Sequence, residues 1–163
     1  MSYIEKVLLV FLCIIIINSV YQCNAYGQSA VEIDNYCHDV AEYYGIPYEI
    51  LPAIIRVESD YLQSAVSHKD AYGLMQVRQP AYIDYSNRNP VSCKRWISNY
   101  SIVKSDWKAN ISVGAWYLVK ICYEPRTNWK FAITAYNYGV NHTKKLEHYY
   151  NKVKKEMKWE IKI

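Results

Sequence analysis

The sequence has 163 residues, of which 52% are hydrophobic and 21% are charged, and its formal net charge is +4. This length is typical of one domain, and the composition excludes a disordered chain, a collagen-like repeat and a coiled coil. The small positive charge is compatible with an acidic polymer as a partner. It falls well short of the dense basic surfaces of nucleic-acid-binding proteins, so we expect no nucleic-acid partner.

The N-terminal segment has the pattern of a secretory signal. A short charged start precedes an apolar run from Val7 to Ile17, and the small residue Ala25 follows. The run is too short to cross a bilayer comfortably, since a spanning helix needs about 20 residues. We therefore expect residues 1–25 to be a signal peptide that is cleaved after Ala25, which predicts an exported protein. The alternative is a retained N-terminal anchor in which the apolar run extends to Val20.

Signal cleavage would leave Cys37, Cys93 and Cys122 in the mature chain. Three thiols in an oxidising compartment predict one disulfide and one remaining sulfur, and the sequence does not choose among the three pairings. The sequence has no HExxH or CxxC motif, and its four histidines lack ligand-like spacing. We therefore expect no metal site and no other cofactor.

Apolar residues at helical spacing predict a mostly α-helical fold for the mature chain. The first stripe starts at Ile33 and ends before Gly45, and Asp106 is a candidate N-cap for a later helix. Pro80 and Pro90 indicate that residues 77–102 form a loop region with at most short helices. Helices are expected over residues 33–44, 47–59, 107–122 and 129–136, and from about residue 143 onward. We expect one domain over residues 26–145 and a basic helix or tail over 146–163.

The helix over residues 47–59 carries an acidic residue on its apolar face. Helical spacing from each residue of that face leads to Glu58. Burial disfavours an ionised carboxylate and raises its pKa, as a general acid near neutral pH requires. The alternative is a helix-end glutamate that is solvated or paired with Arg56 or Lys69. The apolar face consists of Leu51, Ile54 and Ile55.

Four short segments follow one another along the chain: Glu58-Ser59, Ser64 to Ser67, Gly73 to Val77, and Ala135 to Gly139. Their order and residues resemble the SLT-type lytic transglycosylases, whose signature blocks are E-S, G-L-M-Q and A-Y-N-x-G. The resemblance covers roughly residues 37–145 and also includes the helix over 106–118. It implies a lysozyme-like α fold.

The resemblance further implies an enzyme of peptidoglycan that acts in the periplasm or cell wall without a cofactor. Enzymes of this family cleave the β-1,4 bond between N-acetylmuramic acid and N-acetylglucosamine. Glu58 would protonate the glycosidic oxygen and then, as a carboxylate, take the proton of the muramic C6 hydroxyl. That hydroxyl closes onto C1 and gives a 1,6-anhydro product.

The resemblance also assigns roles to residues around Glu58, each of which has a plainer structural alternative. Ser67 can be an ordinary turn serine, Ser59 a helix cap and Asn137 a loop brace. Gln76 would offer an amide donor and acceptor to a sugar. The expected substrate-binding residues are Ser67, Gln76 and Tyr136, and the expected supporting residues of the cleft are Ser59, Gly73, Met75 and Asn137.

Three positions depart from the family pattern, and at the first of them Gln63 replaces a frequent proline. Arg78 stands where the family often has a methionine, which puts a cation at the wall of the cleft. Asp70 replaces a frequent glycine. If its carboxyl lay about 5 to 5.5 Å from that of Glu58, the protein would be a hydrolytic muramidase of the retaining type. A solvated loop aspartate is the simpler interpretation.

The small size, with no recognisable wall-anchoring module, resembles specialised transglycosylases that open the wall for secretion, conjugation or pilus systems. The expected partners are therefore peptidoglycan strands and components of such a machine. A different interpretation is a wall-binding assembly protein whose activity is incidental.

Overall fold

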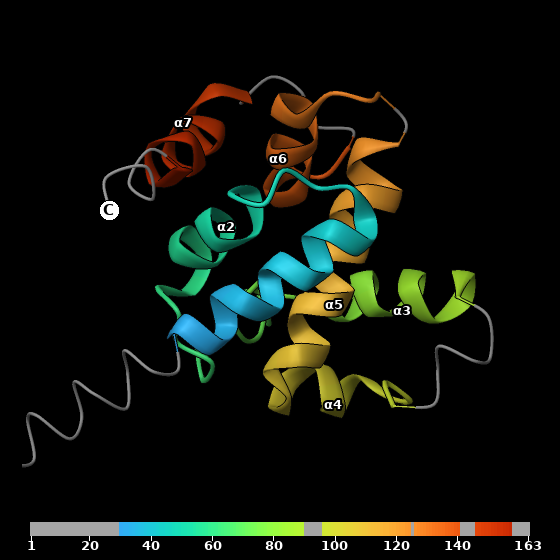
Figure 1. Ribbon diagram of the computed structural model, residues 1–163. Helices are drawn as coiled ribbons and strands as arrows, with labels where there is room; N and C mark the ends of the chain where they lie inside the picture. Colours follow the sequence, from blue (N-terminus) through green and yellow to red (C-terminus); the bar gives the residue numbers. More distant parts are fainter. Residues whose placement is uncertain (1–29, 90–95, 125, 141–145, 158–163) are drawn as a thin grey trace, which may run out of the picture. The chain divides into compact units, whose positions relative to one another are not determined.

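Figure 1 shows the computed structural model, which describes residues 30–89, 96–124, 126–140 and 146–157. The chain forms two compact units, Met1–Asn35 and Tyr36–Ile163. In the first unit the described residues are 30–35, all of them helical. The expected signal peptide and Cys93 lie outside the described residues. All further description concerns the second unit.

The fold of the second unit is helical, as the periodicity predicts. Extended pairing among the described residues is limited to two isolated bridges, Val66 with Tyr72 and Tyr72 with Val77. Within the same residues no helix combines the length and hydrophobicity that a bilayer crossing needs. After a helix over residues 30–44 come α2 (Ile50–Ser59), α3 (Gln79–Arg88), α4 (Tyr100–Ser105), α5 (Trp107–Tyr117), the π-helix η2 (Leu118–Tyr123), α6 (Trp129–Tyr138) and α7 (Leu146–Met157).

Several helix ends lie where the sequence places them. The first helix stops at residue 44, directly before Gly45. Asp106 caps α5 through Oδ1, which accepts hydrogen bonds from the N–H groups of Lys108 at 2.8 Å and Ala109 at 3.0 Å. Pro52 is the third residue of α2, because that helix starts at Ile50. A proline costs no helical hydrogen bond there, since the first four N–H groups of a helix have no partner within it.

Two segments differ from the expectation. Residues 77–102 were expected to hold at most short helices, yet α3 has ten residues, with Pro80 at its second position where proline is favourable. The helix expected over 107–122 is α-helical only to Tyr117 and then continues as the π-helix η2. Apolar spacing does not distinguish these two hydrogen-bonding patterns.

The core of the unit is built by α2, α5, η2 and α6. Each large aliphatic side chain buried there contributes about 1.5 to 3 kcal/mol. The C-terminal helix α7 packs against both α2 and α6 (Figure 1), and its Val153 is fully buried. Within the 146–163 segment, expected as a basic helix or tail, the described residues 146–157 form a helix of the same packed unit. Fully buried core side chains include Leu51, Ile54, Ile55, Ile111, Leu118 and Ile133.

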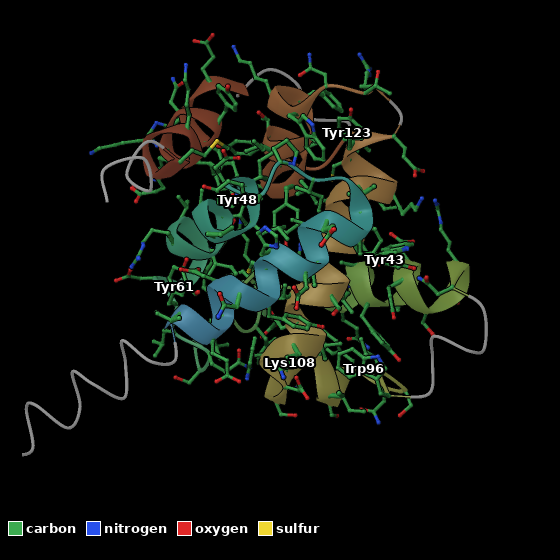
Figure 2. The ribbon with its side chains drawn as sticks, in the orientation of Figure 1. Tyr43, Tyr48, Tyr61, Trp96, Lys108 and Tyr123 are labelled. Carbon is green, nitrogen blue, oxygen red and sulfur yellow. The ribbon has the colours of Figure 1, made fainter. Side chains whose placement is uncertain are left out.

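The tyrosines occur both on the surface and in the interior. Tyr43 and Tyr48 are exposed, as is Trp96, and all three are labelled in Figure 2. Tyr85 and Tyr149 are buried. The buried members act partly as the large aromatic core residues that a chain with two phenylalanines otherwise lacks.

Candidate active site

Glu58 lies in the last turn of α2, and its carboxyl is held by side chains from two other helices. The hydroxyl of Tyr149, on α7, donates a hydrogen bond of 2.6 Å to Glu58 Oε1. The side chain of Asn137, on α6, also hydrogen-bonds the carboxyl. Burial raises the pKa of Glu58, while these two hydrogen bonds and the positive charge of Lys152 oppose the rise. The net direction is upward, which confirms the expectation from the helix face.

Neither of the two cations expected as alternative ion-pair partners, Arg56 and Lys69, forms an ion pair with the Glu58 carboxyl among the described residues. Arg56 Nη1 instead pairs with Asp60 Oδ1 at 2.8 Å. Lys69 is exposed and is not among the groups that shift the pKa of Glu58. The interpretation of Glu58 as the ion-pair partner of Arg56 is therefore wrong.

The Gly73 to Val77 segment forms a tight turn beside Glu58's helix. Tyr72 and Val77 exchange both backbone hydrogen bonds, at 3.1 and 2.9 Å. Gly73 has φ +75°, a conformation that suits glycine. A Cβ on Gly73 would also lie 2.5 Å from Asn110 Nδ2. Any larger residue at position 73 would therefore displace either the turn or the Asn110 side chain.

Asn110, on α5, is completely buried and holds this turn through hydrogen bonds of its side-chain amide. Its Oδ1 accepts the N–H of Met75 at 2.8 Å. Its Nδ2 donates to the carbonyl oxygens of Tyr72 at 2.8 Å and Val103 at 3.0 Å. A buried amide that makes three hydrogen bonds fixes the backbone around it.

Tyr136 attaches α6 to the same turn. Its hydroxyl donates to the carbonyl oxygen of Met75 at 2.7 Å. Burial raises the pKa of Tyr136 well above its ordinary value, so the phenol is a neutral donor. Gly114 makes room for this contact, because a Cβ there would lie 2.6 Å from Met75 Sδ and 3.0 Å from Tyr136 Oη. Met75 is fully buried, so it is a packing residue beneath the site.

The two predicted serines have structural hydrogen bonds. Ser59 Oγ donates to the carbonyl oxygens of Leu74 at 2.9 Å and Ile55 at 3.1 Å, which connects the end of α2 to the turn. Ser67 Oγ accepts the N–H groups of Lys69 and Ala71 at 3.3 and 3.2 Å. Ser67 therefore has at least the role of a turn serine.

Gln76 differs in one respect from its expected role. Its Nε2 donates to the carbonyl oxygens of Ala65 at 3.2 Å and Gly73 at 3.0 Å. The amide nitrogen is therefore engaged within the protein. The group that Gln76 offers to a ligand is its carbonyl oxygen, an acceptor.

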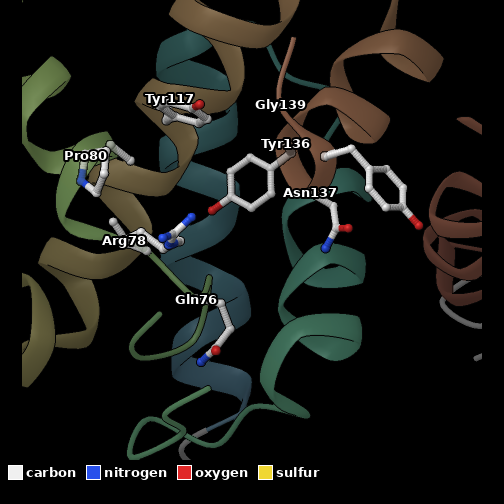
Figure 3. Close-up of a pocket in the computed structure, with 10 residues that line it drawn as sticks. Gln76, Arg78, Pro80, Tyr117, Tyr136, Asn137 and Gly139 are labelled. Carbon is white, nitrogen blue, oxygen red and sulfur yellow. The ribbon is translucent and has the colours of Figure 1, made fainter. Parts of the chain in front are cut away.

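A pocket of about 220 Å³ opens between the turn, the start of α3 and the end of α6 (Figure 3). Gln76 and Arg78 line it, together with Tyr117, Tyr136 and Asn137. Asn137 both lines the pocket and hydrogen-bonds the carboxyl of Glu58. Glu58 is not itself one of the lining residues; it adjoins the pocket through Asn137 and through Tyr136, whose pKa its charge raises.

Asp70 lies in the exposed turn that follows Ser67. Its N–H donates to the carbonyl oxygen of Ser67 at 3.1 Å, and its side chain is exposed. Among the described residues, no carboxylate contributes to the pKa shift of Glu58. These observations favour the simpler interpretation of Asp70 as a solvated loop residue.

Sequence reasoning missed Tyr149 and Asn110 as parts of the site. Tyr149 shares the apolar face of its helix with Val153, and a tyrosine on a buried face must find a partner for its hydroxyl. Asn110 lies on the buried face of α5 among apolar residues. A polar group on an apolar stripe was the available signal in both cases, as it was for Glu58.

The helical unit, with a half-buried glutamate next to a polar, aromatic pocket, agrees with the lysozyme-like fold that the resemblance implies. The Transglycosylase SLT domain family matches residues 35–158, and the chain belongs to this family.

A solved structure, that of an inactive mutant of the lytic transglycosylase Slt from Pseudomonas aeruginosa, has the same fold, with a TM-score of 0.56 and 22% sequence identity. The match covers 76% of this chain and 20% of that one, so the chain spans about a fifth of that enzyme's length. A comparison with curated proteins gives no match.

Proposed function

We propose that this protein is a peptidoglycan lytic transglycosylase that cleaves the bond between N-acetylmuramic acid and N-acetylglucosamine and forms a 1,6-anhydromuramoyl end. Membership of the SLT family supports the substrate and the reaction class. The observation that carries the proposal is the carboxyl of Glu58, which burial keeps protonated to higher pH than an ordinary glutamate. Such a group is suited to donate a proton near neutral pH.

In the first step Glu58 gives its proton to the glycosidic oxygen, and the bond from that oxygen to the muramoyl C1 breaks. The C1 centre then has oxocarbenium character, and Glu58 is a carboxylate. The hydrogen bonds from Tyr149 and Asn137 stabilise the carboxylate at this stage.

In the second step the carboxylate removes the proton of the C6 hydroxyl while the C6 oxygen bonds to C1. The ring closure consumes no water and returns the proton to Glu58. One side chain therefore serves as acid and then as base, and a second carboxylate is not required.

The test is mass spectrometry of the fragments released from purified peptidoglycan. We expect anhydro ends, one water lighter than the reducing ends that a hydrolase gives. Glu58→Gln is expected to abolish release, whereas Asp70→Asn, the same carboxyl-to-amide change on an exposed residue, retains it. Reducing ends that disappear in Asp70→Asn would instead identify a hydrolytic muramidase.

We also propose that the protein is exported to the periplasm or cell wall and opens the wall locally for a secretion, conjugation or pilus system. The apolar run from Val7 to Ile17 supports export. Cell fractionation tests it. Complementation with Glu58→Gln tests the biological role, because a variant that restores assembly fully would indicate a wall-binding scaffold instead.

A further inference from the structure

Arg78 brings a positive charge to the pocket. Among the pocket-lining residues, all of which belong to the described part of the chain, it alone carries a charge. Figure 3 places Arg78 and Pro80 on the side of the pocket formed by the start of α3, and Asn137 on the side formed by the end of α6. Arg78 is exposed, so a ligand can reach it.

The orientation of Arg78 leaves the outer part of its guanidinium available. Its Nε donates to the carbonyl oxygen of Lys69 at 3.0 Å, which anchors the inner edge of the group. No ion pair of Arg78 occurs within residues 30–89, 96–124, 126–140 and 146–157. The two Nη groups form the fork that binds a carboxylate through two parallel hydrogen bonds.

The backbone adds to this positive potential. Arg78 is the N-cap of α3, and no side chain caps the N–H groups of that helix's first turn. Pro80 and Ala81, from that first turn, line the pocket. A helix N-terminus carries a partial positive charge that favours a nearby anion.

Acidic residues lie near this region, although none of those described forms an ion pair with Arg78. Asp84 and Asp70 lie close enough to raise the pKa of Tyr117 and Tyr100 respectively, and Arg78 acts on both tyrosines in the opposite direction. These carboxylates partly offset the positive charge of Arg78 at the rim of the pocket. Long-range attraction of an anion is therefore weak, and direct contact between the ligand and the guanidinium matters more.

We propose that Arg78 binds a carboxylate on the lactyl substituent of a muramoyl residue, and so distinguishes muramoyl from glucosaminyl units in the glycan. This inference rests on the proposed function, because peptidoglycan supplies the ligand. The carboxylate has two sources: the free lactyl group of a glycan without peptide stems, and the peptide stem where one is attached. Both present the same planar anion to the guanidinium.

The test measures binding by calorimetry in a Glu58→Gln background, so that the ligands stay intact. Three ligands of equal length are compared: stem-free peptidoglycan fragments, stem-bearing fragments, and the neutral oligomer of N-acetylglucosamine. Arg78→Met is expected to weaken binding of a carboxylate-bearing fragment about tenfold, as the loss of a charged hydrogen-bonded contact at an exposed site predicts. Binding of the neutral oligomer is expected to stay within about twofold.

Two further variants control for side effects. Arg88→Met makes the same change in the last turn of α3, and it is expected to leave all three affinities unaltered. Arg78→Lys keeps the charge but loses the fork, so it is expected to bind the carboxylate ligands with intermediate affinity. If thermal unfolding shows that Arg78→Met does not fold, Arg78→Lys and the salt dependence of the Glu58→Gln affinities give the same answer, since only the carboxylate ligands should weaken with salt.

The pattern of loss identifies the ligand. A loss confined to stem-free fragments supports the lactyl carboxylate, a loss confined to stem-bearing fragments supports the stem, and either result supports a carboxylate site. An equal effect on all three ligands, or no effect, would overturn the inference. If the unmodified enzyme releases anhydro fragments while Arg78→Met binds normally, the inference fails and the proposed function stands. If the Glu58→Gln protein binds none of the glycans and the unmodified protein releases no anhydro fragments, both fail.

Discussion

Replacing Tyr149 by phenylalanine removes one hydroxyl from the site and leaves the ring. The hydroxyl is the donor of the 2.6 Å hydrogen bond to Glu58, and Tyr149 as a whole is buried, with 4% of its surface exposed. Water therefore has little access to replace the lost donor. The carboxyl keeps its burial and its hydrogen bond from Asn137.

Two effects follow from this change. A hydrogen bond to a charged group contributes about 1.5 to 3 kcal/mol, and it is made most fully when Glu58 is ionised, so the maximal rate is expected to fall by about 10- to 100-fold. The bond from Tyr149 lowers the pKa of Glu58, so its loss raises that pKa further. The acid form then persists to higher pH, and the alkaline limb of the pH–rate profile moves upward.

The assay is the rate of anhydro-fragment release from peptidoglycan across the pH range over which the folded protein is stable. Tyr150→Phe is the matched control, because it removes the same atom from the next residue of α7, whose ring faces Lys130 and not Glu58. We expect that control to retain the rate and pH profile of the unmodified enzyme.

A uniform fall in rate with an unmoved alkaline limb would refute the reasoning, because a purely structural role of Tyr149 lowers the amount of competent enzyme equally at every pH. An unchanged rate at all pH values would show that the hydroxyl does not act on the reacting carboxyl.

Four further results are expected. Because the pKa of Glu58 is raised by folding, its contribution to stability is complete below its ordinary value of 4.5 and is lost as the pH rises through the folded value, so Glu58→Gln should melt higher than the unmodified protein at pH 7 and equally at pH 4. Gly114→Ala should lower the free energy of unfolding by about 1 to 3 kcal/mol, since its Cβ would overlap Met75, as chemical denaturation can measure. Asn110→Ala removes three hydrogen bonds to the backbone, those with Met75, Tyr72 and Val103, and leaves the N–H of Met75 without the acceptor it has now, so it should cost about 3 kcal/mol in the same assay. Burial raises the pKa of the Cys122 thiol to about 12, so this thiol should react with an alkylating agent at pH 8 only when the protein unfolds. Mass spectrometry of the alkylated peptides should therefore give the same rate for Cys122 modification as for unfolding.

The sequence predicts the main helices well, because their signals are local. The stripe of α2, the N-cap Asp106 and the position of Gly45 each depend on residues within one or two turns of the feature they predict. The same locality located Glu58, which stands out as a carboxylate on an apolar face. The recognition of the family added the residues of the turn and of α6.

The errors arose where distant segments decide the outcome. The hydrogen-bond partner of Glu58, Tyr149, lies 91 residues further along the chain, on α7. Arg56 lies on the same helix as Glu58, and no local sequence pattern predicts that Glu58 contacts Tyr149 and not Arg56. The α3 helix has a mostly polar sequence, and its buried residue, Tyr85, packs against Trp116 of α5. Tertiary contacts of this kind stabilise short helices that propensity alone leaves uncertain.

The dependence of Glu58 on α7 has a consequence for local unfolding. When the last helix detaches from α2 and α6, the carboxyl loses its phenol donor and gains water in one event. It then titrates like any solvated glutamate and is mostly ionised at neutral pH. The raised pKa therefore depends on the docking of the C-terminal helix, so unfolding of that helix alone would lower the pKa of Glu58 and weaken the proposed acid.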